Sequence, residues 1–144
     1  MTKSYTSLSE IKSDIAKGEI TVEKLVIDYL NKISANAHLN AFNEIFEDEA
    51  LGCAKKVDAR IKNGSAGKLA GMVIAIKDNI CYKGHKVSAS SKILKDFVAV
   101  YSSTIFDRLL AEDAVIIERC NCYVFAMGTA NENSFFVPVK NYAD

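Results

Sequence analysis

The most constraining feature of the sequence is its most apolar short run, the five residues from Met72 to Ile76. Gly71 precedes the run and Lys77-Asp78-Asn79 follows it, so the pattern predicts a buried β-strand that ends at Lys77. Burial disfavours the cationic form of a lysine, lowers its pKa and makes the amine usable as a base. The alternative for Lys77 is a strand-end lysine that reaches solvent.

A second apolar run, Val115–Ile117, predicts another buried strand, and a helix over Ser103–Ala111 precedes it. Strand, helix and strand in this order predict a βαβ arrangement with a parallel sheet. The fold class expected from the chain is therefore α/β. The segment between the first strand and this helix, 81–97, shows no clear period.

The first 64 residues carry the helical patterns. Ser7-Leu8-Ser9-Glu10 is a capping box and Gly18 a stop, which predicts a helix over about 7–17. A second helix begins after Thr21, a short strand covers Ala41–Phe46, and a third helix capped by Glu47 or Asp48 ends near residue 62. The apolar positions of the second helix follow the spacing of one helical face: Val22, Leu25, Val26, Tyr29, Leu30 and Ile33.

Composition excludes several classes of protein. The 144 residues hold 18 basic and 18 acidic side chains, so no net charge favours nucleic acid or an anionic membrane. No apolar run approaches the roughly 20 residues of a membrane span, and we expect no membrane partner. Four cysteines without a secretory signal predict reduced thiols in the cytoplasm. Cys120-x-Cys122 with Cys81 and His85 lacks the paired spacing of structural zinc sites, so we expect no metal.

Four blocks of the sequence resemble the amidase signature family, in order and with matching spacing. The first block, Leu69–Ile80, resembles the lysine motif of that family. Two further blocks are Phe125–Gly128 with Asn131–Ser134, and Pro138–Asn141. The fourth block, Lys86–Leu94, and the N-terminal helices fit the branch formed by the A subunits of bacterial glutamyl-tRNA(Gln) amidotransferases.

The resemblance implies a Ser–cis-Ser–Lys amidase in which Lys77 is the catalytic base. It implies glutamine hydrolysis, with ammonia passed to a partner subunit that activates Glu-tRNA(Gln) with ATP and magnesium. The B and C subunits of the amidotransferase would be the partners, and this chain itself would hold no cofactor. Met127 and Gly128 are candidates for backbone contacts that line the substrate pocket. An unactivated serine hydroxyl needs an adjacent base, which a desolvated lysine can provide.

The family's two catalytic serines lie in a glycine-serine loop that is expected beyond Asp144, so we expect the 144 residues alone to be inactive. They correspond to the N-terminal part of a single amidase domain: helices over 7–62, a lysine strand and βαβ segment over 69–120, and a pocket-lining segment over 121–144. Two positions hold Glu118 and Val137 where the family normally has glycine. Tyr123-Val124 replaces an acidic pair.

Other interpretations remain open. The nearest is a stand-alone amidase of another substrate, because the discriminating residues are expected downstream. Another is a truncated or engineered non-catalytic fragment that self-associates through the apolar residues of 123–125 and 135–137. Ser88, Ser90, Ser91 and Ser134 are better read as loop hydroxyls than as nucleophiles, and His38 as a solvated residue near the end of the second helix.

Overall fold

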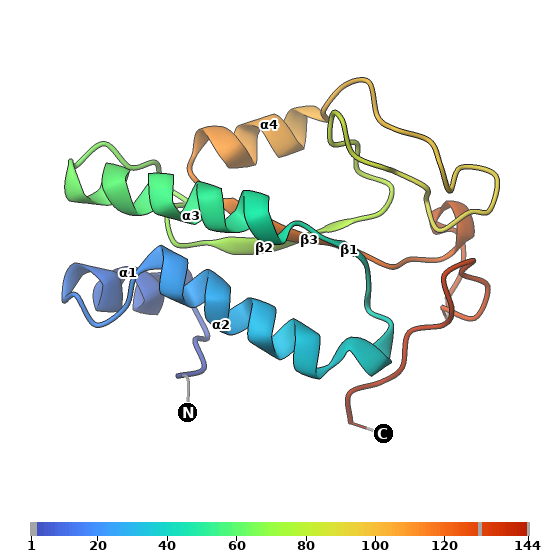
Figure 1. Ribbon diagram of the computed structural model, residues 1–144, viewed down its shortest axis with the longest axis horizontal. Helices are drawn as coiled ribbons and strands as arrows, with labels where there is room; N and C mark the ends of the chain where they lie inside the picture. The colour runs from blue at the N-terminus through green and yellow to red at the C-terminus, as the bar shows by residue number, and fades with distance from the viewer. Residues whose placement is uncertain (1–2, 130, 144) are drawn as a thin grey trace. The chain divides into compact units, whose positions relative to one another are not determined.

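Helices occupy most of the first half of the chain, and three short strands form one small sheet. The computed structural model describes residues 3–129 and 131–143. All the helices and strands expected from the sequence are present (Figure 1). In chain order they are α1 (Leu8–Ala16), α2 (Val22–Ala35), the 3-10 turn η1 (Ala37–Leu39), β1 (Phe42–Ile45), α3 (Glu47–Lys62), β2 (Val73–Lys77), α4 (Thr104–Ala111), β3 (Val115–Cys120) and the 3-10 turn η2 (Val124–Ala126).

The ends of α1 follow the predicted capping chemistry. The Ser7 hydroxyl accepts from the Glu10 N–H at 3.3 Å, and the Glu10 carboxylate accepts from the Thr6 N–H at 2.9 Å. Gly18 closes the helix with a φ of 75°, in the left-handed region that glycine tolerates. The capping box and the glycine stop are therefore confirmed.

The predicted cap of α3 is wrong. Phe46 is the N-cap residue, and no side chain caps the helix. The Phe46 carbonyl accepts the first helical bond, from the Ala50 N–H at 2.8 Å. Glu47 and Asp48 lie in the first turn instead, where their negative charges are stabilised by the helix dipole rather than by capping bonds.

The fourth predicted helix is confirmed, with the Ser103 hydroxyl accepting from the Phe106 N–H at 3.3 Å at its start. Phe106 is the buried residue of this helix, at 1% exposure, whereas its neighbour Ile105 is 59% exposed.

The strands form a mixed sheet in the order β1–β3–β2. β1 and β3 are antiparallel, with Glu44 opposite Arg119 and Ile45 opposite Glu118. β2 and β3 run in the same direction, because Val115 bonds to Met72 at 2.9 Å and Asp78 bonds to Cys120 at 3.1 Å. The parallel βαβ arrangement and the α/β fold class are confirmed.

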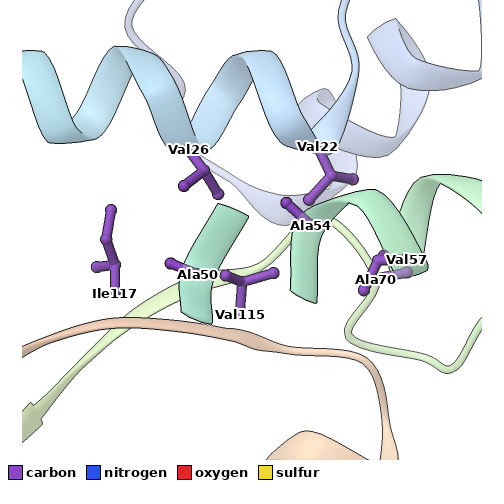
Figure 2. Packing of buried hydrophobic residues seen from close by; sticks show 8 residues of the cluster. All are labelled: Val22, Val26, Ala50, Ala54, Val57, Ala70, Val115 and Ile117. Atoms are coloured by element: carbon purple, nitrogen blue, oxygen red, sulfur yellow. The ribbon is translucent and has the colours of Figure 1, made fainter. Parts of the chain in front are cut away.

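The main apolar core lies where α2, α3 and β3 meet. In Figure 2, Val22 and Val26 of α2 point toward Ala50 and Ala54 of α3, and Val115 and Ile117 of β3 approach the same cluster. Alanines on α3 let the two helices approach closely, and α2 and α3 lie side by side in Figure 1. The predicted apolar face of α2 is therefore its core face.

The chain groups into two compact units. The first consists of Met1–Ala35, Phe46–Ile74 and Arg108–Ile117, and it contains the core of Figure 2. The second consists of Asn36–Ile45, Ala75–Asp107 and Glu118–Asp144. Among the described residues, no helix is both long enough and apolar enough to span a bilayer.

Candidate functional site

Lys77 ends β2, as predicted, and its carbonyl accepts from the Ile80 N–H at 2.9 Å in the turn that follows. The predicted burial of this strand is wrong. Ile76 is 3% exposed, but Ala75 and Lys77 are both exposed. β2 has one hydrogen-bonded neighbour, β3, so part of its surface is left uncovered by the sheet. The described residues therefore place the amine in solvent, and desolvation of Lys77 would require a further covering segment.

The next residue, Asp78, is the most densely bonded side chain of the site. It is 1% exposed, and its carboxylate accepts from the N–H groups of Ser88 and Ser90, both at 3.0 Å. The Ser88 hydroxyl donates to the same carboxylate. Asn43 adds a fourth donor from β1 through its side-chain amide, at 3.0 Å. A β-bulge between Phe42 and Glu44 accompanies this contact, and bulges commonly redirect a side chain in this way.

The serines of the 88–91 loop are buried and hydrogen-bonded. The Ser91 hydroxyl accepts from the Ile93 N–H at 3.2 Å, and the Ser88 hydroxyl accepts from the Ser90 N–H at 3.1 Å. The Ser90 hydroxyl donates to the Asn121 side chain at 3.0 Å and accepts from the Cys122 N–H at 3.0 Å. Ser88 and Ser91 thus make the local bonds that were predicted, whereas Ser90 bonds to a distant segment.

Ser134 and His38 also lie as predicted. The Ser134 hydroxyl accepts from the Phe136 N–H at 3.2 Å, as a turn hydroxyl does, and it also donates to the Asn121 side chain, 13 residues away, at 2.6 Å. His38 is exposed within η1, which follows the carboxyl end of α2.

A cavity of about 300 Å³ opens beside Asp78 in the second compact unit. Its charged lining consists of Glu44, Asp78, Lys86, Lys95 and Arg119, and Asn43, Ser88 and Phe136 complete it. The sequence did not single out Arg119. The one signal for Arg119 in the sequence is that a charged pair, Glu118-Arg119, directly follows the apolar run of the predicted strand.

Arg119 is 1% exposed, and its guanidinium carries the charge compensation of this cavity. Its Nε lies 3.3 Å from the Glu44 carboxylate, and its Nη1 lies 3.6 Å from the Asp78 carboxylate. One buried cation thus lies between two carboxylates, and two lysines also line the cavity. Such a group of charges is suited to holding polar groups in a fixed arrangement. Lys77 does not line this cavity.

The two predicted backbone-contact residues, Met127 and Gly128, follow η2 in the same compact unit as Lys77. Met127 is 76% exposed, and its N–H already donates to the Val124 carbonyl at 3.2 Å. Gly128 has a φ of 152°, and a Cβ there would lie 3.3 Å from the Tyr123 ring. Both positions are accessible to a ligand, while the role assigned to them stays a prediction.

Glu118 occupies a buried position of β3. It is 6% exposed, and its Oε2 has no hydrogen-bond partner among the described residues. Desolvation raises the pKa of its carboxyl to about 7. Near neutral pH this side chain is therefore present both as the acid and as the carboxylate. A glycine, which the family resemblance predicts at this position, has no such ionisable group.

The apolar terminal stretch is largely uncovered. Phe125, Phe135 and Val137 are 48%, 42% and 56% exposed, and Tyr123, Val124 and Phe136 are half-buried. An ordinary core position is thus excluded for the first three. The self-association expected of such a surface stays a prediction.

Comparison with known proteins identifies the family. The family model described as Amidase matches residues 24–144. The A subunit of the glutamyl-tRNA(Gln) amidotransferase of Chlorobaculum tepidum is 43% identical over 141 residues, which is 97% of this chain and 29% of the relative. The chain thus spans less than a third of the length of the curated relatives that it matches.

Solved structures agree with the sequence comparison. A chain of a vestigial protein complex, connected with the evolutionary origins of an s-triazine catabolic enzyme, superimposes with a TM-score of 0.89 and 29% identity, over 96% of this chain and 31% of its own. A bacterial aryl acylamidase of the amidase signature enzymes gives a TM-score of 0.86 and 26% identity, over 95% and 29%. The chain with Lys77 at the end of β2 therefore belongs to the amidase family.

Proposed function

We propose that this chain is the lysine-bearing part of a glutaminase subunit, the A subunit of a glutamyl-tRNA(Gln) amidotransferase. The observation that supports the proposal is the 43% identity to such a subunit over 97% of the chain, with Lys77 held at the carboxyl end of β2. The carboxyl ends of parallel strands are where α/β folds usually build their sites.

In the proposed reaction, Lys77 removes a proton from a serine, which in turn activates a nucleophilic serine supplied by the remainder of the amidase fold. The nucleophile attacks the side-chain amide carbon of glutamine, and ammonia leaves as the acyl-enzyme forms. Water then releases glutamate. An unprotonated lysine is required for the first step, so the covering segment that removes Lys77 from solvent is part of the proposal.

The ammonia would be consumed by the B subunit, with the C subunit completing the complex, in the conversion of Glu-tRNA(Gln) to Gln-tRNA(Gln). ATP and magnesium would act on that partner, and we assign no residue of this chain to them. A stand-alone amidase of another substrate is the alternative function, because solved relatives with this fold include an aryl acylamidase.

A hybrid subunit tests the proposal. The matching 141 residues of the Chlorobaculum tepidum protein are replaced by this chain, and the hybrid is combined with the B and C subunits of that organism. We expect glutamine-dependent ammonia release, which Lys77→Ala lowers by at least about 1000-fold because the serine loses its base. The 144 residues alone should release none.

The matched control is Lys62→Ala, at the exposed carboxyl end of α3, which should leave the rate unchanged. A hybrid that remains fully active with Lys77→Ala would contradict the assigned role of this lysine. A folded hybrid that hydrolyses aryl amides but not glutamine would favour the stand-alone amidase.

A further inference from the structure

We propose that Asp78 is a positioning residue, which holds the end of the Lys77 strand and the segment that carries Met127 and Gly128 in one hydrogen-bonded frame. The inference rests on the proposed function for its catalytic consequence, whereas the frame itself is a property of this chain. Its centre is the Asp78 carboxylate. Four donors from β1 and from the 88–90 loop converge on it, and the side chain is 1% exposed.

The main chain around Lys77 is fixed through the same residue. The Asp78 N–H donates to the Cys120 carbonyl of β3 at 3.1 Å, and the Asp78 carbonyl accepts from the Ala89 N–H at 2.8 Å. The Lys77 carbonyl accepts from the Ile80 N–H at 2.9 Å. The Lys77 carbonyl and both backbone groups of Asp78 are therefore bonded, and these bonds fix the backbone from which the Lys77 side chain leaves the strand.

The 88–90 loop extends the frame to the C-terminal segment. The Ala89 carbonyl accepts from the Phe125 N–H at 2.9 Å, and the Ser90 carbonyl accepts from the Phe135 N–H at 3.0 Å. The Ser90 hydroxyl adds the bond to the Cys122 N–H at 3.0 Å. Three of the bonds that attach the 121–136 segment thus come from a loop whose conformation depends on Asp78.

The loop needs that support, because its backbone is unfavourable in isolation. Ala89 and Ser90 have φ values of 47° and 51°, in the left-handed region that costs a residue with a Cβ about 1 kcal/mol or more. Two N–H groups and one hydroxyl of this loop donate to the Asp78 carboxylate. An asparagine at position 78 has the same shape as the aspartate, but it is uncharged and would turn an NH2 group toward these donors. The Asp78→Asn variant therefore removes the charge and part of the hydrogen bonding while it keeps the size of the side chain.

The first experiment measures amide hydrogen exchange in the 144-residue chain carrying Asp78→Asn. We expect exchange to accelerate at least about tenfold in both 77–91 and 121–136, while α2 and α3 keep wild-type rates, because local opening follows the shared bonds. Faster exchange in 88–90 alone, with 121–136 unchanged, would overturn the proposal. So would equal acceleration throughout the chain.

The matched control is Asp113→Asn. Asp113 is another buried acid, 4% exposed, that accepts from Arg60 at 2.6 Å and from the Gly67 N–H at 2.6 Å. Its variant should accelerate exchange around 60–69 and 109–114 and leave 121–136 unchanged. If Asp78→Asn does not fold, Ser88→Ala removes one donor, and Ser88→Thr should restore the wild-type pattern because it keeps the hydroxyl.

The second experiment uses the hybrid subunit. Asp78→Asn should lower kcat for glutamine about 100-fold and change KM by less than about threefold, since a misdirected base costs rate rather than binding. If the Asp78→Asn hybrid has the same kcat per folded molecule as the Asp113→Asn hybrid, Asp78 has only a structural role and the inference is overturned. If the unsubstituted hybrid is inactive, the proposed function fails, and hydrogen exchange still decides whether the frame exists.

Discussion

The two compact units of the chain are stabilised in different ways. In the first unit, α2 and α3 bury Val22, Val26 and Val57 to 2% exposure or less, and periodic apolar residues carry the stability. In the second unit, the residues buried most deeply include Asp78, Ser90 and Arg119, and a hydrogen-bonded polar network takes the place of a helical core. Polar networks of this kind specify one arrangement, but they tolerate the loss of a partner poorly.

The backbone shows the same contrast. Seven described residues other than glycine have positive φ values, and six of them (Asn40, Ala89, Ser90, Phe125, Ala126 and Val137) belong to the second unit. Asp113 is the one in the first unit. Unfavourable backbone conformations persist where surrounding bonds hold them, and they often accompany sites. The unit that contains Lys77 thus keeps several unfavourable backbone conformations, which its hydrogen bonds hold in place.

The largest expected effect is the loss of apolar packing in the first unit. Leu25→Ala, at a position 2% exposed on α2, should lower the free energy of unfolding by about 3–5 kcal/mol because it leaves a cavity in the core. Denaturant unfolding followed by circular dichroism measures the change. Leu110→Ala, at a position 36% exposed on α4, is the matched control and should cost less than about 1 kcal/mol. Equal losses would break the distinction between core and surface in this unit.

The next effect concerns the buried acid of the second unit. The pKa of Glu118 is raised from 4.5 to about 7, so folding favours its protonated form. Its contribution is fully present below about pH 4.5 and is lost as the pH rises through about 7. Moving a pKa by one pH unit corresponds to about 1.4 kcal/mol, so the free energy of unfolding should fall by about 3 kcal/mol between pH 4 and pH 8.

Glu118→Gln removes this ionisation. We expect the variant to be more stable than the wild type at pH 8 by up to about 3 kcal/mol, and to show no such advantage at pH 4. Urea unfolding at intervals of one pH unit measures both profiles. Glu19→Gln, at an exposed position, should keep the wild-type profile. A wild-type stability that does not fall between pH 5 and pH 8 would contradict the raised pKa of Glu118.

The contrast between the units also explains which features the sequence could predict. Helices α1 and α2 follow from local signals, the capping box at Ser7 and the apolar spacing after Thr21. Both ends of α1 and the start of α2 were predicted to within about one residue. The sequence left open whether Lys77 is buried or reaches solvent, because the answer depends on which neighbours β2 acquires; the structure has it exposed. The Asp78 network also escaped prediction, since its partners Asn43 and Ser90 lie 35 and 12 residues away along the chain.

The smallest expected effect is that of Val137→Gly. This substitution tests whether an unfavourable backbone conformation of the second unit is strained at this position. Val137 has a φ of 84°, which is costly for a β-branched residue. Val137→Gly relieves this strain and gives up little burial, because the side chain is 56% exposed. The bond from the Asn121 amide to the Val137 carbonyl, at 2.9 Å, is to the backbone and is retained.

The strain relieved at Val137 should exceed the added flexibility of glycine in the unfolded chain, so we expect Val137→Gly to raise the free energy of unfolding by about 1 kcal/mol. Val139→Gly is the matched control. Val139 is not among the described residues with positive φ, so its replacement should instead destabilise the protein by about 0.5–1 kcal/mol. If both variants lose stability equally, the left-handed conformation at Val137 carries no strain, and the backbone contrast between the two units holds only for the residues bonded to the Asp78 network.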